Sequence, residues 1–325
     1  MLPLLARRQD VRVTVVADID TDARTRALAQ MPGAAVEADW RAALARDDLD
    51  AVVITLPTAL HAEAALAAIG RGLALYLEKP LASTLEDATT VREAWRATGV
   101  TLALGFNSRF HPLVRQMRDH LRAGGIGEPR IVRCNFTVAA RHDSSWRHHA
   151  APGGGVLHDL ASHHVDLVRF LLDRAIVGVS AVVAIQADGS ETVAASGALD
   201  GGVVLSATWA SGVVDDDVVE VVGTRGAVRL SRYESLALTR RGPTVPGVGA
   251  RLAGHVPTAD AVAFGLARRR APWNDPSFAA ALDNFITAAK RKTAVVPGVD
   301  EGWHSARVVA AIAEAASTGR AVAIG

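Results

Sequence analysis

The stretch VRVTVVADID, residues 11–20, has the pattern of a buried strand that ends in an acidic residue, Asp18. β-branched residues favour strands, and the second strand of a dinucleotide-binding domain ends in such a carboxylate. A domain of that type begins with another strand and a G-x-G-x-x-G turn. Only ten residues precede the stretch, they contain no glycine, and the glycine pattern occurs nowhere in the sequence. We therefore expect the first strand and its phosphate-binding turn to lie upstream of Met1.

Strand-like and helix-like segments alternate from residue 11 to about residue 105. The expected strands are 11–18, 50–57, 73–80 and 100–107, and the expected helices are 21–31, 58–72 and 84–99. Apolar strands that alternate with helices indicate an α/β fold with a parallel, Rossmann-type sheet covered on both faces. Ligands of such sheets bind at the carboxyl ends of the strands. We therefore expect Asp18, Pro57, Lys79 and Asn107 at one rim.

After residue 107 the pattern changes to a group of strands with few helices between them. The expected strands are 129–139, 176–186, 191–199, 202–211, 216–222 and 227–231, and the expected helices are 112–123, 156–173, 277–290 and 300–318. This order predicts an α+β unit with a large, mainly antiparallel sheet. The sequence thus divides into a nucleotide-binding domain, 1–107, and a substrate and oligomerisation domain, 108–325. The Gly- and Pro-rich segment 240–276 is interpreted as a long surface excursion.

Composition excludes several classes of protein. Half of the residues are hydrophobic and the formal net charge is +1, which gives no electrostatic basis for binding nucleic acid or an anionic membrane. No apolar run approaches the ~18 residues of a membrane span. The single cysteine, Cys134, excludes an internal disulfide and a Cys-rich metal site and fits a reducing compartment. These features predict a cytoplasmic protein without a metal site.

The densest chemical signal is GGGVLHDLASHHVDL, residues 153–167. On a helix, Asp159 and His163 are one turn apart on the same face, and Asp166 continues that stripe. Their neighbours are apolar, so the carboxylate and the imidazole form either a structural pair or an acid–base site. The three glycines before the helix favour the second interpretation, because backbone without Cβ allows a ligand to approach closely.

A second signal is the tripeptide EKP, residues 78–80, at the end of an expected parallel strand. A lysine at that rim could donate hydrogen bonds to a substrate oxygen. Glu–Lys–Pro is a common tripeptide, and a surface salt bridge is the alternative interpretation.

Taken together, these stretches resemble the glucose–fructose oxidoreductase and inositol dehydrogenase family, called Gfo/Idh/MocA. The resemblance runs nearly end to end. It rests on VVADID, DAVVITLPTALHAEAALAAIGRG, LEKPLA, GFNSRFHP, GGGVLHDLASHHVDL, VVGTRGAVRL and ARVVAAIAEAASTGRAV. It implies an N-terminal Rossmann domain and a C-terminal open sheet that commonly forms homodimer or homotetramer contacts.

By this resemblance, Lys79, Asp159 and His163 match the family's catalytic residues. Oxidation of a CH–OH group needs a base for the hydroxyl proton, and a histidine suits that role near neutral pH. Lys79 would stabilise the developing alkoxide. Asp159 would hold the imidazole or a neighbouring substrate hydroxyl.

The resemblance also implies binding residues for the cofactor and the substrate. The cofactor set is Asp18, Thr55, Pro57, Thr58, His61, Glu78, Lys79 and Asn107. The substrate set is Lys79, Arg109, Trp146, Arg147, Asp159 and His163. Asp18 can accept both ribose hydroxyls and would repel a 2′-phosphate, which favours NAD over NADP, although neighbouring arginines could restore NADP binding. For His61, a structural role is an equal alternative.

The sequence therefore predicts an NAD-dependent oxidoreductase acting on a CH–OH group of a sugar, cyclitol or related polyol. Two alternatives remain. One is a truncated, non-catalytic relative that senses a ligand or binds a partner, and the other is an NAD-dependent glycosidase of the same fold. The identity of the substrate is not encoded in any motif.

Overall fold

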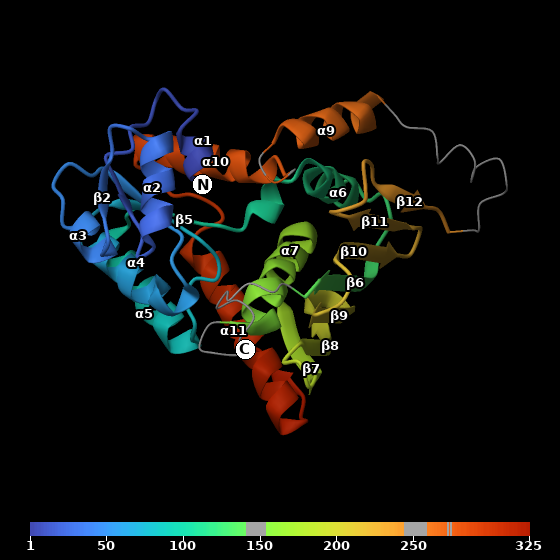
Figure 1. Ribbon diagram of the computed structural model, residues 1–325. Coiled ribbons are helices and arrows are strands. Elements are labelled where there is room, and N and C mark those ends of the chain that lie inside the picture. The colour runs from blue at the N-terminus through green and yellow to red at the C-terminus, as the bar shows by residue number, and fades with distance from the viewer. Residues whose placement is uncertain (141–153, 244–258, 272, 274) are drawn as a thin grey trace.

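The computed structural model describes residues 1–140, 154–243, 259–271, 273 and 275–325 (Figure 1). Within these ranges the strands form one sheet of eight strands and two smaller parallel sheets. The parallel sheets lie at one side of the molecule and the large sheet at the other. The α/β fold predicted from the sequence, with a parallel first part and a mainly antiparallel second part, is confirmed.

The parallel part contains five short strands. They are β1 (Val15–Ala17), β2 (Ala35–Glu37), β3 (Ala51–Ile54), β4 (Ala74–Leu77) and β5 (Leu102–Leu104). β1 pairs with β2, and β3, β4 and β5 pair in that order. In a continuous doubly wound sheet the first strand lies between the strands that correspond here to β1 and β3. None of the described residues forms a strand at that position.

Helices cover both faces of the β3–β4–β5 sheet. Leu75 and Leu77 of β4 pack with helices α4 (His61–Gly70) and α5 (Leu85–Thr98). Tyr76 points to the other face, because side chains alternate along a strand, and it packs against helix α10 (Ser277–Arg291). A helix from the end of the chain thus completes the N-terminal layer. The proposed division at residue 107 stays a prediction.

The large sheet has the strand order β12-β11-β10-β6-β9-β8-β7-β13. Its strands are β6 (Pro129–Val138), β7 (Ile176–Ile185), β8 (Glu191–Leu199), β9 (Val203–Ser211), β10 (Asp216–Gly223), β11 (Ala227–Ser231), β12 (Thr239–Arg241) and β13 (Val322–Ala323). Only the β6–β9 pair is parallel. Helices α6 (Pro112–Arg122), α7 (Ser162–Leu172) and α11 (Val299–Thr318) lie along one face of this sheet (Figure 1).

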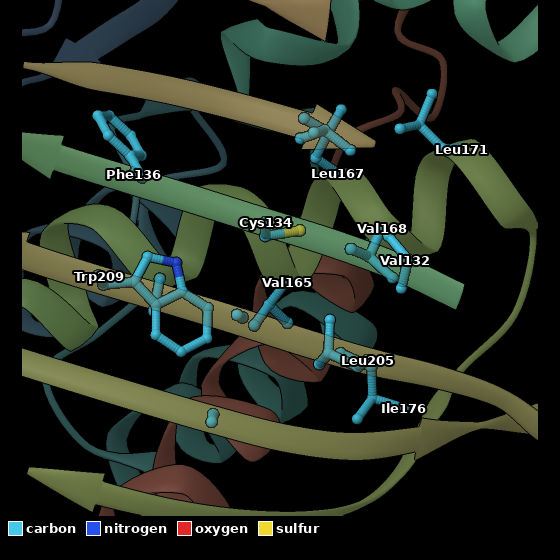
Figure 2. Close-up of a cluster of buried hydrophobic side chains, with 14 of the residues drawn as sticks. Val132, Cys134, Phe136, Val165, Leu167, Val168, Leu171, Ile176, Leu205 and Trp209 are labelled. Carbon is cyan, nitrogen blue, oxygen red and sulfur yellow. The ribbon is translucent and has the colours of Figure 1, made fainter. Parts of the chain in front are cut away.

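The core of this half lies between α7 and the central strands (Figure 2). Every second residue of β6 points inward, among them Val132, Cys134 and Phe136. Val165 and Val168 of α7 meet these side chains from the opposite side. Because α7 is held by this packing, the side chains on its other faces are fixed relative to the sheet.

Two expectations need correction. Segment 240–276 is not only a surface excursion, since its described part contains β12 and helix α9 (Ala259–Arg270), whose Ala261 and Phe264 are buried. The expected helix 156–173 begins with a π-helical turn, Leu157–Ala161, before α7. Helix α1 (Leu2–Leu5) lies in the stretch LPLLARRQD that precedes β1. Helix α3 (Trp40–Leu44) and strands β2 and β13 were not predicted, because each is too short for its periodicity to be detected.

A search of the described ranges finds no helix that is both long and apolar enough to cross a membrane. The cytoplasmic location expected from the composition stays a prediction.

Candidate active site

The centre of the candidate site is an ion pair between the two halves of the molecule. Lys79 follows β4, and its Nζ atom donates to Oδ1 of Asp159 at 2.6 Å and to the backbone carbonyl of Asp159 at 2.7 Å. The Lys79 side chain is 13% exposed and that of Asp159 is 34% exposed. An ammonium group has three donor hydrogens, so one donor remains for a bound molecule. The structure therefore brings together the two residues that the sequence placed eighty positions apart.

Asp159 lies in the π-helical turn that precedes α7. Gly155, just before this turn, has φ +79°, and a Cβ atom there would lie 2.7 Å from Oε2 of Glu191. The same carboxylate oxygen accepts a hydrogen bond from the backbone N–H of Val156 at 2.9 Å. Its positive φ and its closeness to Glu191 give Gly155 a local structural requirement. Gly153 lies outside the described residues.

His163 lies one turn further along, near enough to Lys79 for the lysine charge to act on its imidazole. Its ring packs near Phe106 and Phe136, with centroid separations of 6.5 and 6.2 Å. The side chain is partly buried, and its Nδ1 atom is buried without a hydrogen-bond partner among the described residues. Burial, followed by the positive charges of Lys79 and Arg232, holds the pKa of His163 well below its usual value of 6.5. The imidazole is therefore uncharged at neutral pH and can accept a proton.

Asp166 and Arg109 form a second, buried ion pair. Arg109 donates through Nε to Oδ2 of Asp166 at 2.8 Å and through a terminal nitrogen to Oδ1 at 2.6 Å. Burial raises the pKa of Asp166, an effect that the charge of Arg109 opposes. This bidentate contact ties the segment Asn107–Phe110 to α7. It supports a structural role for Arg109 in place of the expected contact with the substrate.

The carboxyl ends of the parallel strands, at the rim of the sheet, carry the expected cofactor residues. Asp18 is exposed after β1, and its Oδ1 accepts the backbone N–H of Asp20 at 2.9 Å. Thr55 is exposed and Pro57 is partly buried, while the hydroxyl of Thr58 is buried without a partner among the described residues. An unpartnered buried hydroxyl at a ligand rim is compatible with a ligand that supplies the missing hydrogen bond.

His61 has contacts that support the structural alternative. Its Nδ1 lies 2.7 Å from the carbonyl of Pro80 and its Nε2 lies 2.8 Å from the carbonyl of Leu56. Burial lowers the pKa of His61, and a neutral imidazole donates only one hydrogen bond. The ring thus links the segment after β3 to the segment after β4.

The remaining expected residues are distributed over three places. Glu78 lies against Gly105, where an added Cβ atom would come within 2.6 Å of the carboxylate. Asn107 is buried and its amide nitrogen donates to the hydroxyl of Ser277 at 2.9 Å. Trp146 and Arg147 lie outside the described residues.

Sequence reasoning missed the two aromatic rings and the arginine around His163. Phe136 looks like an ordinary inward-facing strand residue, and Arg232 follows a strand that carries no recognised motif. Phe136 and Arg232 come close to α7 only because β6 pairs with β10 and β10 pairs with β11. Within the described ranges, no group of three or more His, Cys, Asp or Glu residues could hold a metal ion.

Comparison with known proteins identifies the family. The model of an oxidoreductase family with an NAD-binding Rossmann fold, GFO/IDH/MocA, matches residues 1–106, and the model of the C-terminal domain of that family matches residues 114–229. The chain belongs to the Gfo/Idh/MocA family. The resemblance stated from the motifs and the expected NAD-binding Rossmann fold are thereby confirmed.

The curated relatives include inositol dehydrogenases. Inositol 2-dehydrogenase 3 of Saccharopolyspora erythraea is 35% identical over 174 residues, which are 52% of this chain and 48% of that protein. Inositol 2-dehydrogenase of Rhodococcus erythropolis is 27% identical over 319 residues, covering 96% of this chain and 88% of the relative. The match thus spans about half the length of the first relative. A solved structure of levoglucosan dehydrogenase, in complex with NADH and levoglucosan, shares the fold with a TM-score of 0.81 at 22% sequence identity. The match covers 99% of this chain and 93% of that chain.

Proposed function

We propose that this protein is an NAD-dependent oxidoreductase that transfers hydride between the nicotinamide and a CH–OH group of a sugar, cyclitol or related polyol. The observation that carries the proposal is the convergence of Lys79, Asp159 and His163 where β4 ends. Ligands of parallel sheets bind at this rim. The names of the relatives, inositol 2-dehydrogenase and levoglucosan dehydrogenase, support the substrate class.

The three side chains can divide the chemistry between them. Oxidation breaks the C–H and O–H bonds of the carbinol, and the O–H electron pair forms the new C=O bond. NAD, when bound, accepts the hydride that leaves carbon. His163, which is uncharged, accepts the hydroxyl proton. Lys79 donates its remaining hydrogen bond to the substrate oxygen as negative charge develops there, and Asp159 fixes the direction of the Lys79 ammonium group.

The residues at the rim fit one end of a dinucleotide. Asp18 would hold the adenosine ribose, since one carboxylate oxygen is fixed by the backbone of Asp20 and the other remains available. Asp20 and Asp22 add negative charge beside it, which disfavours a 2′-phosphate and so favours NAD over NADP. Thr55 and Thr58 would contact the cofactor from the end of β3. The family's glycine-rich turn has no counterpart in the sequence.

The outer face of the large sheet supports a homodimer or homotetramer. Val182 of β7 and Val204 of β9 are 67% and 51% exposed on the face opposite the helices. Exposed apolar side chains gathered on one face are typical of a protein–protein interface. Light scattering on the purified protein measures its oligomeric state directly. A monomer at micromolar concentration contradicts this part of the proposal.

The function is tested by combining the purified protein with NAD or NADP and a panel of polyols that includes myo-inositol and levoglucosan, together with an aryl glycoside. We expect reduced nicotinamide to form with NAD and a ketone to accumulate from at least one polyol. Release of the aryl group without net reduction of NAD supports the glycosidase alternative instead. A folded protein that binds a polyol and turns over none of them supports the non-catalytic alternative.

A further inference from the structure

A cluster of buried polar side chains lies next to His163 and takes no direct part in the proposed chemistry. His164, the next residue of α7, approaches Oδ1 of Asp217 in β10 through Nε2 at 3.0 Å. The indole N–H of Trp209 donates to Nδ1 of His164 at 3.3 Å. Because an indole nitrogen can only donate, Nδ1 must be an acceptor and the proton of His164 lies on Nε2. His164 therefore links α7 to Asp217.

Arg232 closes the cluster on its other side. Its guanidinium lies 3.1 Å from Oδ2 of Asp217, donates to the hydroxyl of Ser108 at 2.6 Å and donates to Oδ2 of Asp275 at 3.2 Å. Asp275 is itself fixed by the backbone N–H of Ser277 at 2.9 Å. The Arg232 side chain is only 12% exposed. One arginine thus joins β10, the segment beside Arg109 and the start of α10.

This cluster and the catalytic residues meet at Phe136. The ring of Phe136 lies 6.2 Å from that of His163 and 5.4 Å from that of His164, measured between centroids. Tyr233, which follows Arg232, packs against the same phenyl ring at 6.4 Å. A shift of Arg232 would therefore change the packing around both histidines.

The charges around His163 come from both sides. On one side lie Lys79, which follows β4, and Asp159 in the π-helical turn. On the other side of α7 lies Arg232 with its partners Asp217 and Asp275. His164 adjoins His163 on α7. His111, which also faces Arg232, stays neutral because burial and the charge of Arg232 lower its pKa to about 4.

We propose that Arg232 is a positioning residue for the redox reaction: through Asp217 and His164 it fixes the first turn of α7, which carries His163. This inference rests on the proposed function, in which His163 accepts the substrate proton. The charge of Arg232 acts in the same direction as the burial of His163, since both lower the pKa of the imidazole.

The two effects of Arg232 can be separated by two substitutions. Arg232→Met removes the charge and leaves two carboxylates unmatched, so His163 should become easier to protonate. Arg232→Lys keeps the charge and loses the planar fork that reaches three partners. Arg268→Met is the matched control, because Arg268 is also an arginine held against this segment, through the backbone carbonyl of Tyr233 at 2.7 Å, and it does not act on the His163 pKa.

The test follows the ring protons of His163 by NMR against pH, with the signal assigned from a His163→Gln spectrum. This readout requires no turnover, so it remains decisive even if the proposed activity fails. We expect Arg232→Met to raise the His163 midpoint by about one pH unit, in keeping with charge effects at short range, while Arg268→Met leaves it unchanged. Equal midpoints in the parent, Arg232→Met and Arg268→Met overturn the electrostatic part. If Arg232→Met does not fold, Arg232→Gln, which also removes the charge, is titrated with the same expectation.

The positioning part is tested by kinetics with the substrate found for the parent. Arg232→Lys should keep the acid limb of the pH profile at the parental pH and the KM near the parental value, while kcat falls by roughly tenfold, as expected for a misplaced base. A parental kcat in Arg232→Lys overturns this part of the proposal.

Discussion

The Nζ atom of Lys79 lies 2.6 Å from Oδ1 of Asp159, although eighty residues of chain separate them. The contact joins the end of β4 to the π-helical turn before α7. It therefore connects the parallel sheet that carries the NAD-binding fold to the helix that carries His163. An ion pair in this position holds the proposed proton acceptor and the proposed oxyanion donor in one site.

Lys79→Met should abolish the stabilisation of the developing alkoxide and remove the Lys79–Asp159 ion pair. Loss of one such donor typically lowers kcat by roughly 10²–10³-fold. The measurement is kcat for NAD reduction with the best polyol. Lys290→Met is the control, since Lys290 pairs with Asp10 at the surface, and equal losses in both variants would show that the Lys79 position has no special role.

Asp18→Asn should weaken NAD binding and reduce discrimination against NADP, because the carboxylate that accepts the ribose hydroxyls and repels a 2′-phosphate is lost. We expect the ratio of kcat/KM for NAD to that for NADP to fall by about tenfold or more, the equivalent of one charged hydrogen bond. Asp188→Asn is the control, because Asp188 is an exposed aspartate in the turn between β7 and β8. An unchanged ratio in Asp18→Asn contradicts the assigned cofactor site.

Arg109→Met should destabilise the fold, because it leaves Asp166 buried and uncompensated. Breaking a buried ion pair in this way costs about 3–5 kcal/mol of unfolding free energy. Asp166→Asn in the same chain should recover much of the loss, since the buried charge is then absent. Denaturant unfolding of the single and double variants measures both effects, and equal stability of the two variants argues against the pair as the cause.

The low pKa of His163 predicts the acid limb of the pH profile. A histidine whose pKa is lowered keeps its neutral form at more acidic pH, so kcat/KM should stay level through pH 6.5 and decline only below that value. A limb centred at or above pH 6.5 would mean that another group, or a His163 with an ordinary pKa, limits the reaction.

Much of this site could be predicted from the sequence, and the reasons are local. Asp159 and His163 are one turn apart, so their spacing indicated a shared helix face. Lys79 ends an apolar strand, which indicated a place at the rim of the parallel sheet. The role of Arg109 could not be predicted in this way, because its partner Asp166 lies 57 residues away and only the packing of α7 brings the two together. The same holds for Arg232, which reaches Asp217 through the pairing of β10 with β11.

Helix α9 shows a different limit. Its segment 240–276 is rich in Gly and Pro residues, so the pattern indicated a surface excursion. Burial of Ala261 and Phe264, with the Phe264 ring 5.2 Å from that of His111, stabilises the helix. Tertiary packing thus outweighed the local composition.

The most direct test of the account compares two histidines of the same segment. His163→Gln removes the proposed proton acceptor, whereas His158→Gln changes a histidine of the π-helical turn whose ring nitrogens face the carbonyls of Gly154 and Ser83. The measurement is kcat/KM for NAD-dependent polyol oxidation at pH 7. We expect His163→Gln to lose roughly 10²–10⁴-fold, as for a general base, and His158→Gln to remain within about threefold of the parent. Equal activity in the two variants would contradict the assignment of His163 as the base.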